Sequence, residues 1–360
     1  MRIVVDVSPL GHQRTGIGNY LLGMLGGLAK AVGEDDQLVA FAPAGPRRKR
    51  VIEQVLDGLP IERRIILVPP SAHTWRTAWS RIGRLSVERV VGRLDVFHFS
   101  DWMYPPQRAG VRTTTVYDLI PVHFPEWVAP LTRRMHGRKY RNAARTCDLI
   151  FAISDYTAAD AAETLHFPRE RIHVAYPGVD ERFRPEGERR DFGAPYVLGV
   201  STVEPRKNLD VLLEAFALVR ERRPDLVLAV AGASGWASGE GPRGAGVHRL
   251  GFVPDDDLPA LYRGASICVY PSLFEGFGIP IVEAMACGTP VVSSAHPSLD
   301  EASGDVALRA DPSSAEAFAD AIERALDEPA ELVSRGLAHA RRFTWRACAE
   351  AVITGYQRAL

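Results

Sequence analysis

The chain has 360 residues, of which 46% are hydrophobic and 24% charged, so it is too long for one ordinary core and too balanced in composition to be disordered. A formal net charge of -1 and an isoelectric point near 6.8 argue against a general nucleic-acid-binding protein. We therefore expect two globular domains.

The cysteines and the N-terminus bear on the cell compartment. The cysteines lie far apart, with no CxxC pair and no histidine cluster at metal-ligand spacing; they are Cys147, Cys268, Cys287 and Cys348. The apolar run in MRIVVDVSPLG is too short for a signal peptide, and no later segment reaches membrane-spanning length. We expect a cytoplasmic protein, or one peripheral to the inner face of the membrane.

Short β-branched runs alternate with helical stretches along the first half of the chain. Strands are expected at 2–7, 38–43, 95–100, 113–119 and 148–154, with a helix at 18–32. The same alternation starts again in the second half. There, strands are expected at 195–201, 226–232, 248–253, 267–272 and 290–294, and helices at 208–224, 257–265 and 280–288. The pattern predicts parallel sheets covered by helices.

The segment between the two series, residues 176–195, is rich in Pro, Gly and charge, which is typical of a domain connection. We place a boundary near Asp191, giving domains at 1–190 and 191–345. Each is expected to be a Rossmann-like, doubly wound α/β domain. Ligands of such sheets sit beyond the carboxyl ends of the strands, so two domains facing one another would form a deep cleft.

A glycine pair opens the first expected helix, in PLGHQRTGIGNYLLGML. Gly16 and Gly18 suggest a dinucleotide fingerprint, but Leu21 stands where the third glycine is required, so we reject a nicotinamide site. The loop can still close over phosphates or an acceptor. A plain turn is the alternative.

Two adjacent cations follow the first strand of the second series, in GVSTVEPRKNLDVLLEAF. Arg206 can pair bidentately with a diphosphate, and Lys207 can act as a point charge. Such a pair would stabilise a departing nucleoside diphosphate without metal. Asn208 is expected to cap the next helix. The alternative is a solvated basic loop beside a helix cap.

Two other stretches in the second half suggest sites that we reject. Asp255, Asp256 and Asp257 resemble an Asp-x-Asp metal motif, but acids at a helix N-terminus account for them without metal. The run GASGWASGEG, at 232–241, lacks the spacing of a nucleophile elbow and is expected to line the cleft.

Two glutamates flank a tight turn in YPSLFEGFGIPIVEAMACGTPVV. Pro280 is expected at the first helical position, which places Glu283 in the first turn. Gly276 and Gly278 allow a ligand close to the backbone at a helix N-terminus. Glu275 can accept hydrogen bonds from sugar hydroxyls, and Glu283 can bind a ribose diol. The alternative is that Glu275 is a solvated loop charge and Glu283 only complements the helix dipole.

Two basic stretches complete the survey, at residues 73–94 and 131–148. The first spaces Trp75, Trp79, Ile82, Val87 and Val90 nearly on one helical face. Tryptophans at this spacing are more often core, so we favour a structural role for both stretches. The alternative is contact with an anionic membrane or an anionic acceptor.

Taken together, these stretches resemble the retaining glycosyltransferases of family 4. The resemblance runs over nearly the whole chain and is most specific at EGFGIPIVE, from Glu275 to Glu283; EPRKN, GFVPDDDLPALYRGASICVYPS and EAMACGTPVV follow the same family pattern in order. It implies a GT-B fold, with a nucleotide sugar bound between two Rossmann-like domains. The ending RRFTWRACAEAVITGYQRAL is similar to the family's closing helix, so residues 346–360 are expected to cross back onto the first domain.

The resemblance also implies roles for particular residues. Arg206 and Lys207 would bind the donor diphosphate, Glu283 the ribose and Glu275 the transferred sugar. The backbone of Gly276, Phe277, Gly278 and Ile279 would contact that sugar, and the segment around Val253 would hold the base. No metal and no cofactor is expected.

One stretch departs from the family pattern. TTTVYDLIPVHFPEW resembles the segment where many members carry a histidine before the aspartate, yet Tyr117 precedes Asp118 here. The histidine's role therefore does not transfer, whereas Asp118 keeps its match. The variant Tyr-Asp-Leu-Ile-Pro resembles a mannosyltransferase branch that often uses GDP-mannose.

The sequence thus predicts transfer of a hexosyl unit, by preference mannose, from a nucleoside diphosphate sugar to the hydroxyl of a sugar, lipid-linked sugar or small-molecule acceptor. No carboxylate nucleophile is evident, so the family's front-face route is favoured, in which the leaving phosphate oxygen deprotonates the acceptor. The alternatives are a non-catalytic two-lobed sugar-nucleotide binder and a nucleotide-sugar epimerase of the same architecture.

Overall fold

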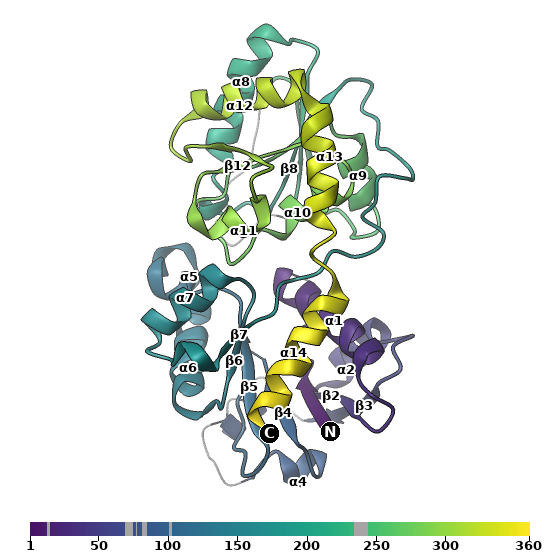
Figure 1. Cartoon of the computed structure of the whole chain (residues 1–360), viewed down its shortest axis with the longest axis vertical. Helices are drawn as coiled ribbons and strands as arrows, with labels where there is room; N and C mark the ends of the chain where they lie inside the picture. Colours follow the sequence, from purple (N-terminus) through teal and green to yellow (C-terminus); the bar gives the residue numbers. More distant parts are fainter. Residues whose placement is uncertain (13–14, 69–74, 77, 81–84, 101–102, 234–243) are drawn as a thin grey trace. The chain divides into compact units, whose positions relative to one another are not determined.

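The computed structural model describes residues 1–360 except 13–14, 69–74, 77, 81–84, 101–102 and 234–243. The chain forms two compact units, shown in Figure 1. Unit 1 comprises Met1–His123, Pro130–Gly178 and Thr344–Leu360, and unit 2 comprises Phe124–Ala129 and Val179–Phe343. These bounds differ from the predicted domains at 1–190, 191–345 and 346–360, and that division stays a prediction.

Unit 1 contains a seven-stranded sheet in the order β3-β2-β1-β4-β5-β6-β7, and every strand pair is parallel. The strands are β1 (Arg2–Asp6), β2 (Gln37–Ala44), β3 (Glu62–Leu67), β4 (Val96–Phe99), β5 (Val111–Val116), β6 (Ile150–Ala152) and β7 (Ile172–Val174). The helices whose two ends lie in the described residues are α1 (Gly16–Ala31), α2 (Pro46–Val55), α4 (Glu88–Val91), α5 (Ile120–His123), α6 (Pro130–Thr146), α7 (Asp155–Thr164) and α14 (Trp345–Ala359). The 3-10 turns are η1 (Ser8–Gly11) and η3 (Arg169–Arg171).

Unit 2 contains a six-stranded parallel sheet in the order β10-β9-β8-β11-β12-β13. The strands are β8 (Tyr196–Val200), β9 (Val227–Ala231), β10 (Val247–Gly251), β11 (Ile267–Tyr270), β12 (Val291–Ser294) and β13 (Leu308–Ala310). The helices are α8 (Leu209–Arg222), α9 (Leu258–Gly264), α10 (Ile279–Ala286), α11 (Asp300–Ser303), α12 (Ala315–Asp327) and α13 (Pro329–Ala340), with 3-10 turns η2 (Pro125–Trp127), η4 (Pro205–Lys207) and η5 (Pro297–Leu299).

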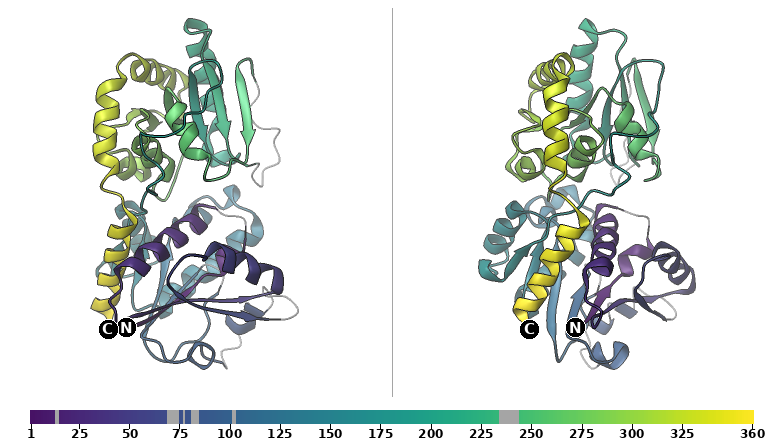
Figure 2. Two further views of the ribbon diagram at one scale, coloured as in Figure 1. Left: turned by 90° about the vertical axis from the view of Figure 1, so that its right-hand side faces the viewer. Right: turned by 45° about the vertical axis from the view of Figure 1, so that its right-hand side comes forward.

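The central strands are buried along nearly their whole length, because helices cover both faces of each sheet (Figure 2). β11, with the sequence ICVY, is buried at every position, and only the first residue of β1 is partly exposed. Continuous apolar strands of this kind are typical of parallel sheets in α/β proteins. The two predicted doubly wound parallel sheets are thus confirmed.

Local sequence explains how the covering helices form. In α12 the Ser314 side chain accepts a hydrogen bond from the Ala317 N–H at 3.1 Å, which caps the first turn. Phe318, Ile322 and Ala325 then recur at helical spacing and join the unit 2 core. The helix therefore forms where a capping residue meets an apolar stripe.

The tryptophan-bearing segment at 73–94 contributes to the core of unit 1. Trp79 is 6% exposed, Trp75 packs against the same core, and their ring centroids are 4.6 Å apart. Val87 is fully buried there, whereas Ile82 lies outside the described residues. The predicted structural role is confirmed for these two tryptophans and Val87.

Helix α14 packs along α1 in unit 1, and glycines of α1 make the approach close. A Cβ atom added at Gly27 would lie 2.2 Å from the carbonyl oxygen of Trp345. Real Cβ atoms do not approach backbone oxygens so closely, so the two helices would have to move apart. At Gly26, one residue earlier, the nearest atom is Leu59 Cδ2 at 3.9 Å, an ordinary contact.

We expect Gly27→Ala to lower the stability of the protein by about 1–3 kcal/mol, because the added methyl group overpacks the contact between α1 and α14. Gly26→Ala is the matched control in the same helix. It should leave stability unchanged or raise it by up to about 1 kcal/mol, since alanine is the better helix former. Thermal unfolding followed by circular dichroism measures both, and equal melting temperatures for the two variants would contradict the close approach.

Candidate active site

The strand order of unit 2 places a topological switch point at the carboxyl edge of its sheet. From β8 the chain proceeds outward through β9 and β10, and it then returns to place β11 on the other side of β8. Loops that follow β8 and β11 therefore diverge, and such a switch point is where open α/β sheets bind their ligands. Arg206 and Lys207 follow β8, and Glu275 follows β11.

The structure brings these three side chains together. Arg206 donates from Nη1 to Glu275 Oε2 at 2.8 Å, and Lys207 donates from Nζ to Glu275 Oε1 at 2.6 Å. The backbone also joins the two loops, because the N–H of Leu273 donates to the carbonyl oxygen of Arg206 at 2.8 Å. One carboxylate thus holds both cations across the switch point.

Burial gives this cluster its electrostatic character. Lys207 is only 7% exposed and Glu275 only 8%, so neither is the solvated loop charge that the alternatives assumed. Burial alone would raise the pKa of Glu275, but the charges of Arg206 and Lys207 lower it to about 2. Burial also lowers the pKa of Lys207, which Glu275 opposes. Glu275 is therefore ionised throughout the physiological pH range.

Glu283 lies in a different environment on α10. It is half-buried, and it accepts a hydrogen bond from the Tyr262 hydroxyl at 3.1 Å. Burial raises the pKa of Glu283 to about 7, and the nearby charge of Asp255 adds to the effect, while the hydrogen bond from Tyr262 opposes it. The two glutamates of the motif therefore differ in their readiness to take up a proton.

Two local expectations around these loops are wrong. Helix α10 begins at Ile279, so Glu283 lies in the second turn and not in the first, where a helix dipole acts most strongly. Asn208 does not cap α8 with its side chain: its backbone has a φ of 54°, and its amide Nδ2 donates to the carbonyl oxygens of Pro271 and Pro312. Asn208 instead holds two loops of unit 2 beside the cation pair.

The turn between the glutamates has the backbone that its glycines imply. Gly278 has a φ of 105°, a backbone angle that residues with a side chain rarely adopt. A Cβ atom at this position would lie 2.9 Å from Leu299 Cδ2. Phe277 is buried, and Ile279 is the first residue of α10. Val253 follows β10 and is half-buried beside the exposed Phe252. Gly276, the remaining member of the predicted set, is buried in the same turn.

The predicted residues of the first half all lie in unit 1. Gly16 is the first residue of α1, and a Cβ atom there would meet nothing within 4 Å, while Gly18 is buried one half-turn later. Asp118 follows β5 and accepts a hydrogen bond from the N–H of Ile120 at 3.0 Å. Tyr117 packs edge-on against Tyr20, with ring centroids 5.4 Å apart. Of the glycine run at 232–241, residues 234–241 lie outside the described part of the chain.

Several polar side chains near the switch point of unit 2 were not identified by the sequence analysis. Tyr270 accepts a hydrogen bond from Lys207 at 2.9 Å, and Glu204 accepts one from Arg206 at 3.0 Å. The Ser201 hydroxyl, at the end of β8, is buried and has no hydrogen-bond partner among the described residues. A serine directly after a strand is the only sequence signal that could have indicated it.

The corresponding switch point of unit 1, between β1 and β4, holds a buried acid. Asp6 ends β1, and its carboxylate accepts hydrogen bonds from the hydroxyls of Ser8, at 2.6 Å, and of Ser100, which follows β4. Burial raises the pKa of Asp6, although the hydroxyls and the charge of Arg76 oppose the shift. The sequence analysis did not identify Asp6 as a candidate site residue, because it lies within an apolar segment that was predicted as a strand.

Within the described ranges, no group of His, Cys, Asp and Glu side chains is arranged to hold a metal ion. Asp256, in the acidic run, pairs with Arg182. No helix in the part of the chain that the structure describes has both the length and the apolar character needed to cross a membrane.

Comparison with known proteins identifies the family. The model of glycosyltransferase family 4 matches residues 14–183, and the model of glycosyl transferases group 1 matches residues 180–342. The chain is also 30% identical to the O-antigen chain mannosyltransferase B of Escherichia coli, over 99% of this chain and 100% of that protein. The chain belongs to glycosyltransferase family 4. It is thus a glycosyltransferase of a retaining hexosyltransferase family, and it transfers a sugar from a nucleotide sugar.

Two further similarities extend this result. The MMP alpha-(1->4)-mannosyltransferase of Mycolicibacterium hassiacum is 31% identical to this glycosyltransferase, over 65% of this chain and 60% of that one. The structure of HepE from Anabaena in complex with UDP and glucose superposes with a TM-score of 0.69 at 16% identity, covering 99% of this chain and 100% of that chain. The second similarity concerns the fold, which is the GT-B fold that the sequence predicted.

The raised pKa of Glu283 predicts a pH dependence of stability. The folded enzyme holds a proton on Glu283 up to a pH of about 7, whereas the unfolded chain loses it near 4.5. The resulting stability is complete below about 4.5 and is lost as the pH rises to about 7. Wild type should therefore lose stability relative to Glu283→Gln over this interval, as melting temperatures at a series of pH values would record.

Glu275→Gln is the control for this measurement. The pKa of Glu275 is lowered to about 2, so its contribution is present above 4.5 and is lost only as the pH falls towards 2. The offset between wild type and Glu275→Gln should therefore stay constant between pH 4.5 and 7. A similarly constant offset for Glu283→Gln would show that Glu283 has no raised pKa.

Proposed function

We propose that this glycosyltransferase transfers mannose from GDP-mannose to an acceptor hydroxyl with retention of the anomeric configuration and without a metal ion. The observation that carries the catalytic part is the buried cluster of Arg206, Lys207 and Glu275 at the switch point of unit 2. The choice of mannose is supported by the Escherichia coli and Mycolicibacterium relatives, which are both named mannosyltransferases.

In this proposal the cation pair binds the donor diphosphate. The ammonium of Lys207 has three N–H donors, of which Glu275 and Tyr270 take two, and a phosphate oxygen can take the third. The guanidinium of Arg206 adds a planar donor group that matches phosphate geometry. Because Glu275 and Glu204 accept hydrogen bonds from Arg206, and Glu275 also accepts one from Lys207, the cations are held in place before a ligand arrives.

The two glutamates take different parts of the donor. Glu275 is ionised and accepts hydrogen bonds from hydroxyls of the transferred sugar, together with the backbone of Gly276, Phe277, Gly278 and Ile279. Glu283 binds the ribose, and the segment at Val253 holds the base. Ser201 adds a buried hydroxyl whose hydrogen-bonding capacity is unused among the described residues.

The main catalytic demand is the negative charge that grows on the departing diphosphate. Fixed cations in a site of low dielectric stabilise that charge without reorganisation during the reaction. The leaving phosphate oxygen then takes the proton from the acceptor hydroxyl on the same face of the sugar. Asp118 of unit 1 is proposed to contact the reacting sugar, and Gly16 and Gly18 to contact the donor phosphates.

We expect Lys207→Met to lower turnover by about two orders of magnitude or more, because the change removes a charge that stabilises the leaving group. Methionine keeps an apolar stem of similar length, and Glu275 keeps Arg206 as its partner, so the fold should persist. Rates of mannose transfer, with melting temperatures measured in parallel, test this expectation.

Tyr270→Phe is the matched control for Lys207→Met. It removes one hydrogen bond to Lys207 but leaves the ammonium in place, so turnover should fall by less than about tenfold. Near-normal turnover in a folded Lys207→Met protein would remove Lys207 from the mechanism. Equal losses in both variants would assign the effect to the local hydrogen-bond network.

The donor itself is tested by a thermal-shift series with GDP, UDP, GDP-mannose and UDP-glucose. A ligand that binds only the native state raises the melting temperature by mass action, so GDP-mannose should give the largest shift. Lys207→Met should reduce that shift. A larger shift with UDP-glucose would contradict the assignment of GDP-mannose and leave the glycosyl transfer itself in place.

A further inference from the structure

Helix α6 of unit 1 has an unusual charge pattern. Its seventeen residues, PLTRRMHGRKYRNAART, include six lysines and arginines and no aspartate or glutamate. Lys139, Tyr140 and Ala143 are buried and face the interior of unit 1. The other cations therefore lie on the remaining faces of the helix, on a protein whose formal net charge is only -1.

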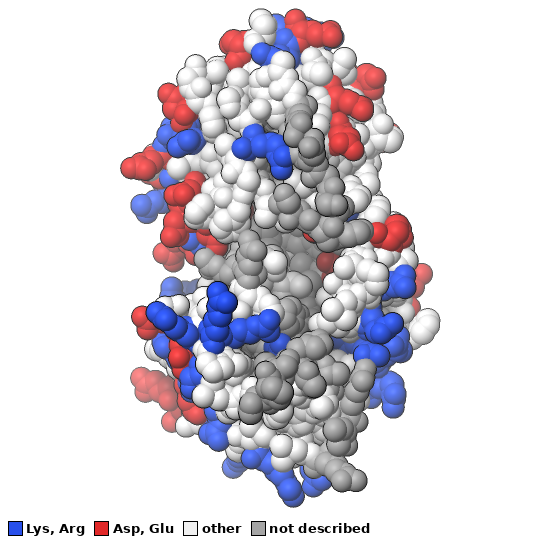
Figure 3. Space-filling view, turned by 180° about the vertical axis from the view of Figure 1, so that it is seen from behind, with Lys and Arg blue, Asp and Glu red and all other residues white. Residues whose placement is uncertain are grey.

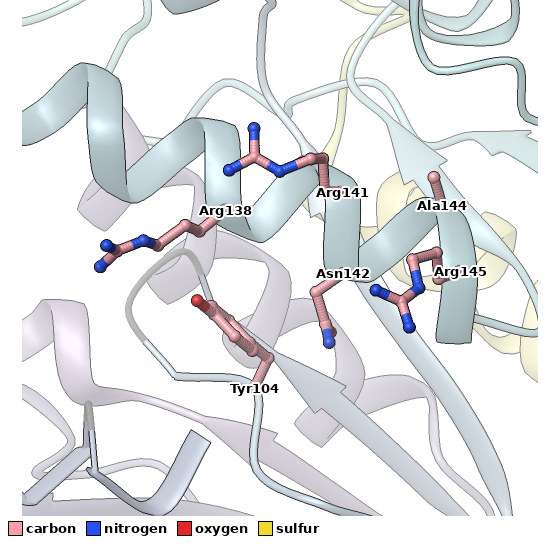
Figure 4. Close-up of a pocket in the computed structure, with 6 residues that line it drawn as sticks. All are labelled: Tyr104, Arg138, Arg141, Asn142, Ala144 and Arg145. Carbon is pink, nitrogen blue, oxygen red and sulfur yellow. The ribbon is translucent and has the colours of Figure 1, made fainter. Parts of the chain in front are cut away.

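Part of this helix forms one wall of a pocket of about 380 Å³. Five of its six lining residues come from α6, and the sixth comes from the segment before β5; they are Arg138, Arg141, Asn142, Ala144, Arg145 and Tyr104 (Figure 4). The volume lies within the range of small-molecule sites. Because the arginines are spaced by three and four residues, they lie along one side of the helix.

The lining has donors and positive charge but no acid. No hydrogen bond or ion pair joins Arg138, Arg141 or Arg145 to another residue in the described part of the chain. The side-chain oxygen Oδ1 of Asn142 accepts hydrogen bonds from Thr146 and Arg112, so the N–H groups of its side-chain amide remain available. The hydroxyl of Tyr104 adds a further polar group. Cations at this spacing repel one another, and an anion in the pocket would relieve that repulsion.

We infer that this pocket binds a phosphate group. Arginine is the residue whose planar N–H pairs match phosphate oxygens, and the three arginines that line the cavity carry enough positive charge for the two charges of a phosphomonoester. The site belongs to unit 1, and it is separate from the cation pair of unit 2 to which the donor diphosphate is assigned.

The phosphate group can belong to a soluble phosphoester or to a lipid headgroup. Figure 3 shows Lys and Arg side chains gathered in groups on the face of unit 1 that it draws, which favours approach of an anion from either source. The chemistry at the pocket is the same in both cases. The experiment is therefore built with one arm for each source.

The test compares three full-length proteins: wild type, the double variant Arg138→Gln with Arg141→Gln, and Arg134→Gln. Arg134 lies on α6 but does not line the pocket, so its loss removes charge from the helix without removing a lining residue. Glutamine has a helix propensity close to that of arginine, so α6 should persist in all three. The soluble arm titrates inorganic phosphate by calorimetry. The lipid arm sediments vesicles of phosphatidic acid in phosphatidylcholine, with phosphatidylcholine alone as the blank.

We expect wild type and Arg134→Gln to bind in at least one arm, and the double variant to bind about tenfold more weakly or worse. Binding in the soluble arm alone identifies a free phosphoester, and binding in the lipid arm alone identifies a headgroup. Equal binding by the double variant and Arg134→Gln would overturn the inference, as would no binding in either arm. Because the donor-site residues are unchanged in every variant, the difference in binding between the variants is independent of the proposed sugar transfer.

Discussion

The buried contact of Glu275 with Lys207 and Arg206 is the constraint on which the site of unit 2 depends. An isolated buried charge would be costly, so each cation needs the carboxylate and the carboxylate needs the cations. The contact spans the loops after two neighbouring strands, β8 and β11. It therefore fixes the relative position of those loops at the place where the sheet topology opens a crevice. The same side chains thus determine both the geometry of the site and its charge.

The same cluster explains why the two glutamates of one motif behave differently. Glu275 faces two cations, which lower its pKa to about 2, whereas Glu283 faces the hydroxyl of Tyr262 and the acid Asp255 in a buried setting that raises its pKa to about 7. Their separation by eight residues places one in the loop and the other beyond the start of α10. A carboxylate that is always charged suits hydroxyl groups in every state of the enzyme. A carboxylate such as Glu283, whose pKa lies near 7, makes any contact with a ligand sensitive to pH.

Much of this arrangement could be predicted from the sequence, because it depends on chain order. Alternating apolar segments give two parallel sheets, and residues that follow neighbouring strands must meet at one edge. The predictions that fail are those in which tertiary contacts determine the local structure. Asn208 adopts a positive φ, which directs its amide to Pro271 and Pro312 and away from the start of α8. The placement of residues 179–195 in unit 2 also depends on such contacts, because Arg263 donates to the carbonyl oxygen of Glu188. No local pattern encodes such long-range contacts.

The two switch points show how one topology can serve different chemistry. In unit 2 the residues after the diverging strands are cations that a carboxylate holds, whereas in unit 1 they are a buried acid, Asp6, that accepts hydrogen bonds from Ser8 and Ser100. The backbone rules that create both crevices are identical, so the difference lies wholly in the side chains that follow each strand. The division of charge between the two sheets is therefore a property of a few loop residues.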